Sequence, residues 1–308
     1  MYNKHTKYFP SKYPIICAGM NTVSDLKLAL AIAEAGCYPS FVAFNYFTMV
    51  EGRFVHNFKS MFNELKDFVY RTGSSNFVLS VTTSLLTDND NTLEILKNIK
   101  PAYIELLDDE FLTNNKYKEV VKILRDHNVK VLVKVLSYEN GVTEIINKDT
   151  SLVDGIIIKN SNAAGRVATE VENIFESIQL IKKLVPEWII VSQGGIYDSN
   201  GIKDHLFAGS DIVSIGTMFA VSEESSISVE TKTKMIQASY SDTVKIGTAN
   251  QNGLLFSKQK HDVENNTIGL RKGIRTGNEG HVFAGAGLDH IDQIQSVSTI
   301  VQKLVTGL

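Results

Sequence analysis

The feature that most constrains the fold is an alternation of short apolar runs with longer helical stretches over residues 14–219. The apolar runs are bounded by turn residues and lie at 14–18, 40–44, 77–81, 103–106, 129–136, 155–159, 188–192 and 211–215. Such runs are typical of buried parallel strands in repeated βα units. Eight units are the number in a (β/α)8 barrel, whereas an open doubly wound sheet normally has fewer strands. The sequence therefore predicts an α/β fold, a (β/α)8 TIM barrel.

The stretches between the apolar runs have helical periodicity. In residues 24–35, 117–127 and 172–184, apolar side chains recur at spacings of three and four, which indicates amphipathic helices. We expect Ser24 to be the N-cap of the first helix and Gly36 to end it.

Composition excludes several functional classes. The 308 residues are 43% hydrophobic and 21% charged, so the chain can bury a core without metals or disulfides. A net charge of -3 argues against a nucleic-acid partner. We find neither an apolar signal core nor a membrane-spanning run, and expect a cytoplasmic protein. Cys17 and Cys37 are expected to be reduced.

The βα pattern stops after the eighth run. Residues 220–287 precede a last amphipathic helix expected near 289–304, and the segment 273–287 contains five glycines. We interpret this excursion as a mobile flap over the site, with a disordered surface loop as the alternative. The prediction is a single domain over residues 1–308, with the barrel at about 14–219 and the flap and terminal helix at about 220–308.

Two glycine sites follow the seventh and eighth runs. They are Gly194-Gly195 and Gly216-Thr217. Without a Cβ atom, a glycine lets backbone N–H groups approach a phosphate, and the short helix that follows would add its positive end. A Gly-Gly pair alone is also common in tight turns. Because TIM barrels often bind phosphate after these two strands, the two sites together predict a phosphate site.

Several motifs resemble the nitronate monooxygenase family of FMN enzymes, which also includes flavin-dependent enoyl-acyl-carrier-protein reductases. These motifs are residues 14–20 (PIICAGM), residues 156–165 and the two glycine sites. The resemblance extends over nearly the whole chain. It implies noncovalently bound FMN, with its phosphate at the glycine sites and its ring over the mouth of the barrel.

Candidate cofactor-binding residues follow from this resemblance position by position. The loop 18–20 matches the segment that meets the flavin ring, while Ser80 and Lys159 stand where the family commonly has Asn and Gln. With Lys134, discussed next, the candidates are Ala18, Gly19, Met20, Ser80, Lys134, Lys159, Gly165, Gly194, Gly195, Gly216 and Thr217.

Lys134, near the end of the fifth run, has two interpretations. Its cation meets the pyrimidine edge of the flavin, or it pairs with Glu105 or Asp108 of the fourth run. Glu105 and Asp108 can themselves form an acid and base pair. Tyr103, Phe41 and Phe44 have the spacing of barrel core.

The sixth run departs from the family. Members usually read Glu-Ala-Gly-Gly-His there, whereas this chain reads Asn162-Ala163-Ala164-Gly165-Arg166. Arginine stays charged and cannot act as a base. We expect Arg166 to hold an anion or to stabilise negative charge on reduced flavin. The alternative is that it faces solvent or pairs with Glu170.

His281 and His290 lie in and just after the glycine-rich segment, so either is a candidate to replace the missing histidine. None of the seven histidines forms a pair at metal-ligand spacing, and no metal is expected.

The resemblance implies an FMN-dependent oxidoreductase like the nitronate monooxygenases, which oxidises a small organic anion with O2 as acceptor. One alternative is an NAD(P)H-dependent enoyl-thioester reductase. Another is a flavin-binding protein that has lost catalysis with its histidine. The expected partner is a small-molecule substrate, and a homodimer is left open.

Overall fold

The centre of the protein is a barrel of parallel strands. The computed structural model describes residues 5–51, 53–82, 85–86, 90–107, 117–168, 172–246, 251–256 and 266–308. Its largest sheet has eight strands in the order β1-β11-β10-β8-β7-β6-β5-β2. These strands are β1 (Ile15–Cys17), β2 (Ser40–Val42), β5 (Val78–Val81), β6 (Tyr103–Leu107), β7 (Lys130–Val135), β8 (Gly155–Lys159), β10 (Ile189–Gln193) and β11 (Ile212–Ile215). Each coincides with one of the eight predicted runs.

The sheet closes between β1 and the residues just before β2. Ile16 bridges Tyr38 in parallel, and the Cys17 amide donates to the Tyr38 carbonyl at 2.9 Å. On its other side β1 pairs with β11. The predicted TIM barrel is confirmed.

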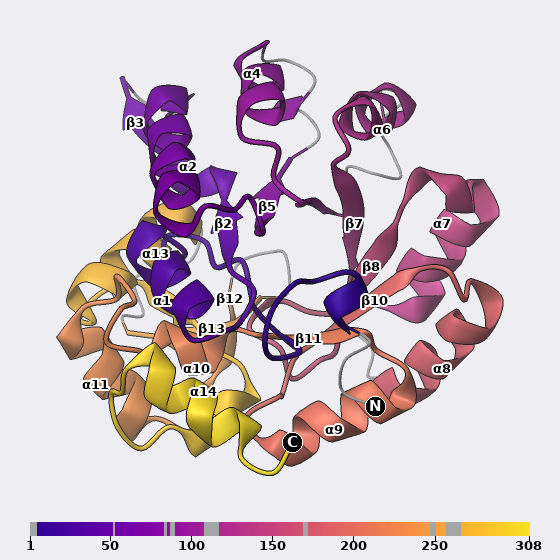
Figure 1. Ribbon diagram of the computed structural model, residues 1–308. Helices are drawn as coiled ribbons and strands as arrows, with labels where there is room; N and C mark the ends of the chain where they lie inside the picture. Colours follow the sequence, from indigo (N-terminus) through magenta and orange to yellow (C-terminus); the bar gives the residue numbers. More distant parts are fainter. Residues whose placement is uncertain are drawn as a thin grey trace.

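Helices surround this barrel (Figure 1). Those that follow barrel strands are α1 (Leu26–Glu34), α2 (Phe58–Thr72), α4 (Asp90–Asn98), α6 (Tyr117–Asp126), α7 (Thr143–Lys148), α8 (Ile174–Leu184) and α9 (Ser199–Ala208). Because side chains alternate along a strand, every second residue points outward. Outward residues such as Ile104, Val133 and Ile156 share one core with buried residues of the helices.

The start of α1 corrects one prediction. Asp25, not Ser24, is the N-cap, and its carboxylate accepts from the Leu28 amide at 3.0 Å. Ser24 instead accepts from the Met20 amide at 2.9 Å and so braces the loop before the helix. Gly36, with φ 83°, follows the C-cap Ala35.

The inner core is closed at the N-terminal end of the strands by aromatic rings. Phe9 stacks on Tyr103 at 4.6 Å and meets Tyr38 edge-on at 5.1 Å. Tyr103 is therefore barrel core, as predicted. Phe41 is also buried, but it packs outside the barrel against Phe68.

In its described residues, the chain between β11 and the last helix forms helices and strands, which does not match the alternative of a disordered surface loop. We call residues 221–246, 251–256 and 266–296 the insertion. Its elements are α11 (Val229–Gln237), β12 (Val244–Ile246), β13 (Gln251–Leu255), α13 (Asn266–Thr276) and β14 (His281–Phe283). The strands form an antiparallel sheet in which β13 also pairs with β9 (Gly165–Arg166) of the barrel.

The last helix, α14 (Val297–Val305), returns to the ring of barrel helices. It packs against both α1 and α9, next to the insertion in Figure 1. It starts later than expected, because residues Ala286–His290 form a separate 3-10 turn, η6. The helix that completes the β11 unit is thus separated from its strand by α10 (Thr217–Ala220) and the insertion.

Shorter elements connect these parts. They are η1 (His5–Lys7), η2 (Ala43–Tyr46), the hairpin β3 (Phe47–Val50) and β4 (Arg53–His56), η3 (Tyr138–Val142), η4 (Thr150–Leu152) and η5 (Tyr240–Asp242). None of the helices in the described ranges has the length and apolar character needed to cross a membrane.

Candidate active site

A cavity of about 350 Å³, open to solvent, lies at the C-terminal ends of the barrel strands. Inward-pointing side chains at the ends of five strands form its polar floor: Ser80, Glu105, Lys134, Lys159 and Gln193. The alternation of side chains along each strand places them on the inner face, above core residues such as Val78 and Leu132. The loop of Ala18, Gly19 and Met20 also borders the cavity.

Three residues of the floor form one buried network. Lys134 Nζ lies 2.5 Å from Glu105 Oε1, and the Ser80 hydroxyl donates to the same oxygen at 3.0 Å. The pairing of Lys134 with Glu105, one of the two interpretations from sequence, is therefore present. Asp108, the other predicted partner, lies outside the described residues.

Lys159 points from β8 toward the loop that follows the strand. Its ammonium donates to the carbonyl of Ala164 at 2.9 Å and to that of Arg166 at 2.5 Å. The side chain thus holds the start of β9 against the barrel.

Arg166 borders the cavity, with its backbone in β9 opposite Gln251 of β13. The side chain is half-buried. Its position brings a guanidinium to the wall of a cavity whose floor already carries two lysines. Glu170, the alternative partner, lies outside the described residues.

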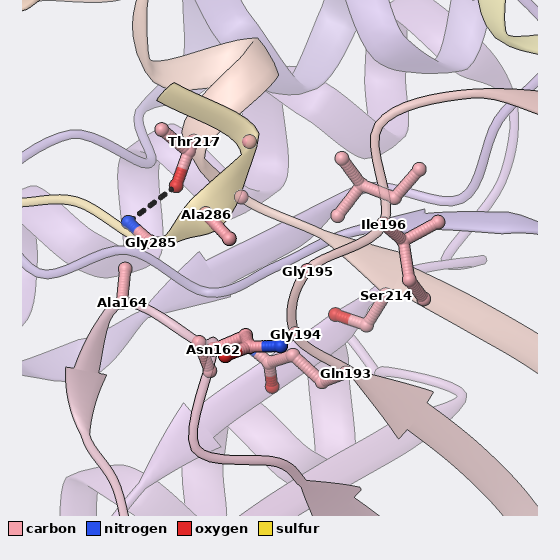
Figure 2. A pocket seen from close by; sticks show the side chains of 14 residues that line it. Asn162, Ala164, Gln193, Gly194, Gly195, Ile196, Ser214, Thr217, Gly285 and Ala286 are labelled. Carbon is pink, nitrogen blue, oxygen red and sulfur yellow. Dashed lines mark hydrogen bonds between the residues drawn. The ribbon is translucent and has the colours of Figure 1, made fainter. Parts of the chain in front are cut away.

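A second, smaller hollow of about 30 Å³ opens beside the cavity. Figure 2 shows how the loops after β8, β10 and β11 face one another around it. Its lining includes Asn162, Gly194, Gly195, Gly216 and Thr217. Residues 285–287 of the insertion form another wall, where the Gly285 amide donates to Thr217 Oγ1 at 3.1 Å. Glycines from two predicted sites thus meet in one pocket.

The glycines are required for different reasons. Gly194 has φ 117°, and a Cβ there would lie 2.2 Å from Asn160 Oδ1, so the fold itself requires glycine. Gly216 has φ -114°, and its Cβ would meet only ordinary contacts, the nearest being Ala18 Cβ at 3.5 Å. The surrounding protein does not exclude a side chain at Gly216, but the pocket would lose space.

A helix end borders the hollow after the eighth strand, as predicted, because α10 begins at Thr217 with Gly216 as its N-cap and both residues line the hollow. The hollow has no such helix end on the side of the seventh strand. The first turn of α9 is capped by the carboxylate of Asp198, which accepts from the Gly201 amide at 2.8 Å. The hollow is therefore lined by turns rather than by the N-terminus of that helix.

The hollow and the cavity are continuous. Ala164, Gln193, Gly216 and Thr217 line both of them. The side-chain oxygen of Gln193 is buried, and the described residues supply it with no hydrogen-bond partner. An elongated ligand with an anionic end in the hollow and a polar ring in the cavity fits this arrangement, which is the shape and chemistry of FMN.

The walls above the polar floor are apolar. They come from the loop after β1, from η2 and the start of β3, from the segment after β5, from α10 and the segment after it, and from α13 and β14. The side chains are Val23, Phe44, Phe47, Leu85, Ala220, Ile227, Leu270, Ile274, Val282 and Phe283. Phe44, predicted as core, is thus a wall residue. The guanidinium of Arg271 on α13 donates to the Phe47 carbonyl and ties the two sides together.

Neither candidate histidine lines the cavity. His281 lies on β14 and is fully buried beside Phe283. The ring of His290 stacks on Tyr197 at 3.4 Å, at a separate surface hollow. In the described part of the chain, no three His, Cys, Asp or Glu residues gather as metal ligands.

Sequence reasoning missed Asn252 and residues 285–287. Asn252 is 4% exposed, and its amide nitrogen donates to the carbonyls of Ser161 and Ala163, both at 3.0 Å. The glycines of 273–287 were a visible signal, but they were assigned to flexibility. For Asn252 the sequence offered only a polar residue in a short glycine-bearing stretch.

The family model for nitronate monooxygenase matches residues 3–307. The chain belongs to the nitronate monooxygenase family. Its curated relatives are distant. A probable nitronate monooxygenase of Staphylococcus aureus strain MSSA476 is 22% identical over 283 residues, which cover 79% of this chain and 75% of that protein. Another, from Staphylococcus saprophyticus, is 29% identical over 133 residues, 41% of this chain and 36% of that protein.

Solved structures share the fold of this nitronate monooxygenase family member. FabK from Thermotoga maritima is 21% identical with a TM-score of 0.77, and the match covers 98% of this chain and 94% of that one. A nitroalkane oxidase from Streptomyces ansochromogenes is 19% identical with a TM-score of 0.74, covering 98% and 97%. At these identities the likeness establishes the barrel, and membership of the family establishes an oxidoreductase.

Proposed function

We propose that this protein is an FMN-dependent oxidoreductase that oxidises a small organic anion such as an alkyl nitronate, with O2 as the acceptor. The observation that carries the proposal is the continuity of the glycine-lined hollow with the cavity, through Ala164, Gln193, Gly216 and Thr217. It supports a ligand with a phosphate at one end and a flavin ring at the other. When bound, FMN supplies the electron-accepting ring.

Different residues of this chain would bind the phosphate and the ring of FMN. Backbone N–H groups near Gly195 and Gly216 would hold the phosphate. Ser80, Lys134 and Lys159 line the floor where the polar edge of the ring would lie. The ammonium of Lys159 would favour negative charge on that ring, whereas the charge of Lys134 is compensated by Glu105.

Arg166 sets the class of substrate. A guanidinium keeps its proton at every physiological pH, so it can orient an anion but cannot abstract a proton from a neutral nitroalkane. We therefore propose that the substrate arrives already ionised and that its charged group faces Arg166. The apolar walls would hold the carbon chain and exclude water.

An enoyl-thioester reductase is the second candidate. The apolar walls of the cavity favour it, and FabK from Thermotoga maritima has the same fold. In that case a reduced nicotinamide, rather than the organic anion, is the electron donor. A flavin-binding protein without catalysis would bind FMN and turn over neither donor.

Anaerobic absorbance spectroscopy of the FMN-loaded protein separates these functions. Propyl-1-nitronate, NADH and NADPH are added in separate cuvettes, and the flavin band is followed. Bleaching by the nitronate alone supports the proposal. Bleaching by a nicotinamide supports the reductase, and no bleaching supports the non-catalytic protein. A protein that takes up no FMN contradicts all three.

A further inference from the structure

The segment 161–166 belongs to both halves of the site. Its first part, Asn162 to Ala164, lines the glycine-lined hollow. Its second part, Ala164 to Arg166, lines the cavity. A shift of this short segment would therefore move the wall of the hollow and the guanidinium of Arg166 together.

Asn252 holds this segment through both its side chain and its backbone. The Nδ2 group donates to the carbonyls of Ser161 and Ala163. The backbone pairs with Gly165, next to the Gln251–Arg166 pair. Asn252 Oδ1 accepts from Lys245 Nζ at 2.6 Å, which fixes the orientation of the amide.

Other contacts secure the same segment, but each reaches only one part of it. Lys159 contacts the carbonyls of Ala164 and Arg166 from the barrel side. The Ala286 amide donates to the Asn162 carbonyl at 2.9 Å. Asn252 is distinguished by contacts that span the segment from Ser161 to Gly165 with one residue.

We propose that Asn252 is a positioning residue that couples the phosphate hollow to Arg166, so that the insertion is part of the cofactor site and not only a cover. The inference rests on the proposed function only in that the hollow takes the FMN phosphate and Arg166 takes an anion. Neither turnover nor the identity of the substrate enters it.

The test is the Asn252→Asp variant. Aspartate has the size of asparagine and keeps an oxygen that accepts from Lys245. Its second oxygen replaces the Nδ2 donor and faces the carbonyls of Ser161 and Ala163. Two dissociation constants are measured: that of FMN by fluorescence titration, and that of propionate at saturating FMN by perturbation of flavin absorbance. Because one buried and one partly buried hydrogen bond are lost, both constants should rise by about tenfold or more. Val244→Thr, an exposed change on β12 of the same sheet, should leave both unchanged.

A double-mutant cycle separates positioning from general loosening. In an Arg166→Met background, Asn252→Asp should no longer affect propionate binding, because the group that it positions is absent. An equal effect in both backgrounds overturns the proposal, as does a change in only one of the two constants in the single variant.

Asn252→Ser, which removes the amide without adding a charge, replaces the aspartate variant if thermal unfolding shows that the latter does not fold. The same two constants are then decisive. A wild-type protein that binds FMN and propionate but is not bleached by nitronate contradicts the proposed function and leaves this test intact. One that binds no FMN contradicts both.

Discussion

Lys134 Nζ and Glu105 Oε1 lie 2.5 Å apart on neighbouring strands at the floor of the cavity, where their side chains are 11% and 3% exposed. Each charge compensates the other where the two side chains have little contact with water. The pair therefore has a structural role in addition to any contact with a ligand, and its removal should be visible in stability.

Lys134→Met should lower the free energy of unfolding by about 3 kcal/mol, because it leaves the Glu105 carboxylate buried without its cation. Replacement of both residues, Lys134→Met with Glu105→Leu, should recover much of this loss. Urea denaturation of the two variants and the wild type measures it. A single variant as stable as the wild type would show that the pair contributes little.

Gly216→Ala should weaken FMN binding more than tenfold while it changes the free energy of unfolding by less than about 0.5 kcal/mol. The added methyl group meets the protein only at ordinary contact distances, but it occupies the space that we propose for the FMN phosphate. Gly195→Ala is the contrasting variant. Its φ of 66° should make it lose stability as well as FMN. Fluorescence titration and thermal unfolding distinguish the two effects.

Arg166→Met should raise the KM for an anionic substrate about 10- to 100-fold, the loss expected for a hydrogen bond to a charged group. The dissociation constant of FMN should change much less, because we propose the neighbouring hollow as the place of its phosphate. Steady-state kinetics with propyl-1-nitronate check this. An unchanged KM would indicate that Arg166 faces solvent.

His205, buried on α9 beside Phe175, predicts a pH dependence of stability. Burial lowers its pKa from 6.5 to about 4, against the opposing charge of Asp204. The unfolded chain thus binds a proton that the folded one does not, and stability should fall as the pH falls from about 6.5 to about 4. The contribution is at most about 3 kcal/mol. In His205→Leu, denaturation curves should depend less steeply on pH in this window, and an equal slope would contradict the assignment.

Cys17 and Cys37 should resist thiol reagents in the folded protein. Both are free and buried, and burial raises the pKa of each thiol, which keeps the reactive thiolate scarce. A chromogenic disulfide reagent at pH 8 should detect neither thiol until urea is added. Rapid reaction of either one without urea would show that the region around β1 opens.

The barrel could be predicted from the sequence because each strand is a buried apolar run with its own turn signals. The insertion could not be predicted, because β12, β13 and β14 are short and pair with segments that are distant in the sequence. Strand β9, for example, pairs with β13 through Arg166 and Gln251. The glycines of the glycine-lined hollow could be predicted because they stand in tight turns after their strands, which is a local sequence signal. Asn252 was missed because its role consists of contacts with carbonyls some ninety positions earlier.

The return of α14 to the barrel ring makes the insertion a module with both ends anchored. Its residues line the cavity, while the order of the barrel strands is independent of it. The pairing of β9 with β13 links the two parts, since the residue at position 166 is carried by the barrel and held by the module. A chimera that brings histidine back at this position would therefore need a matching β13 from the same donor.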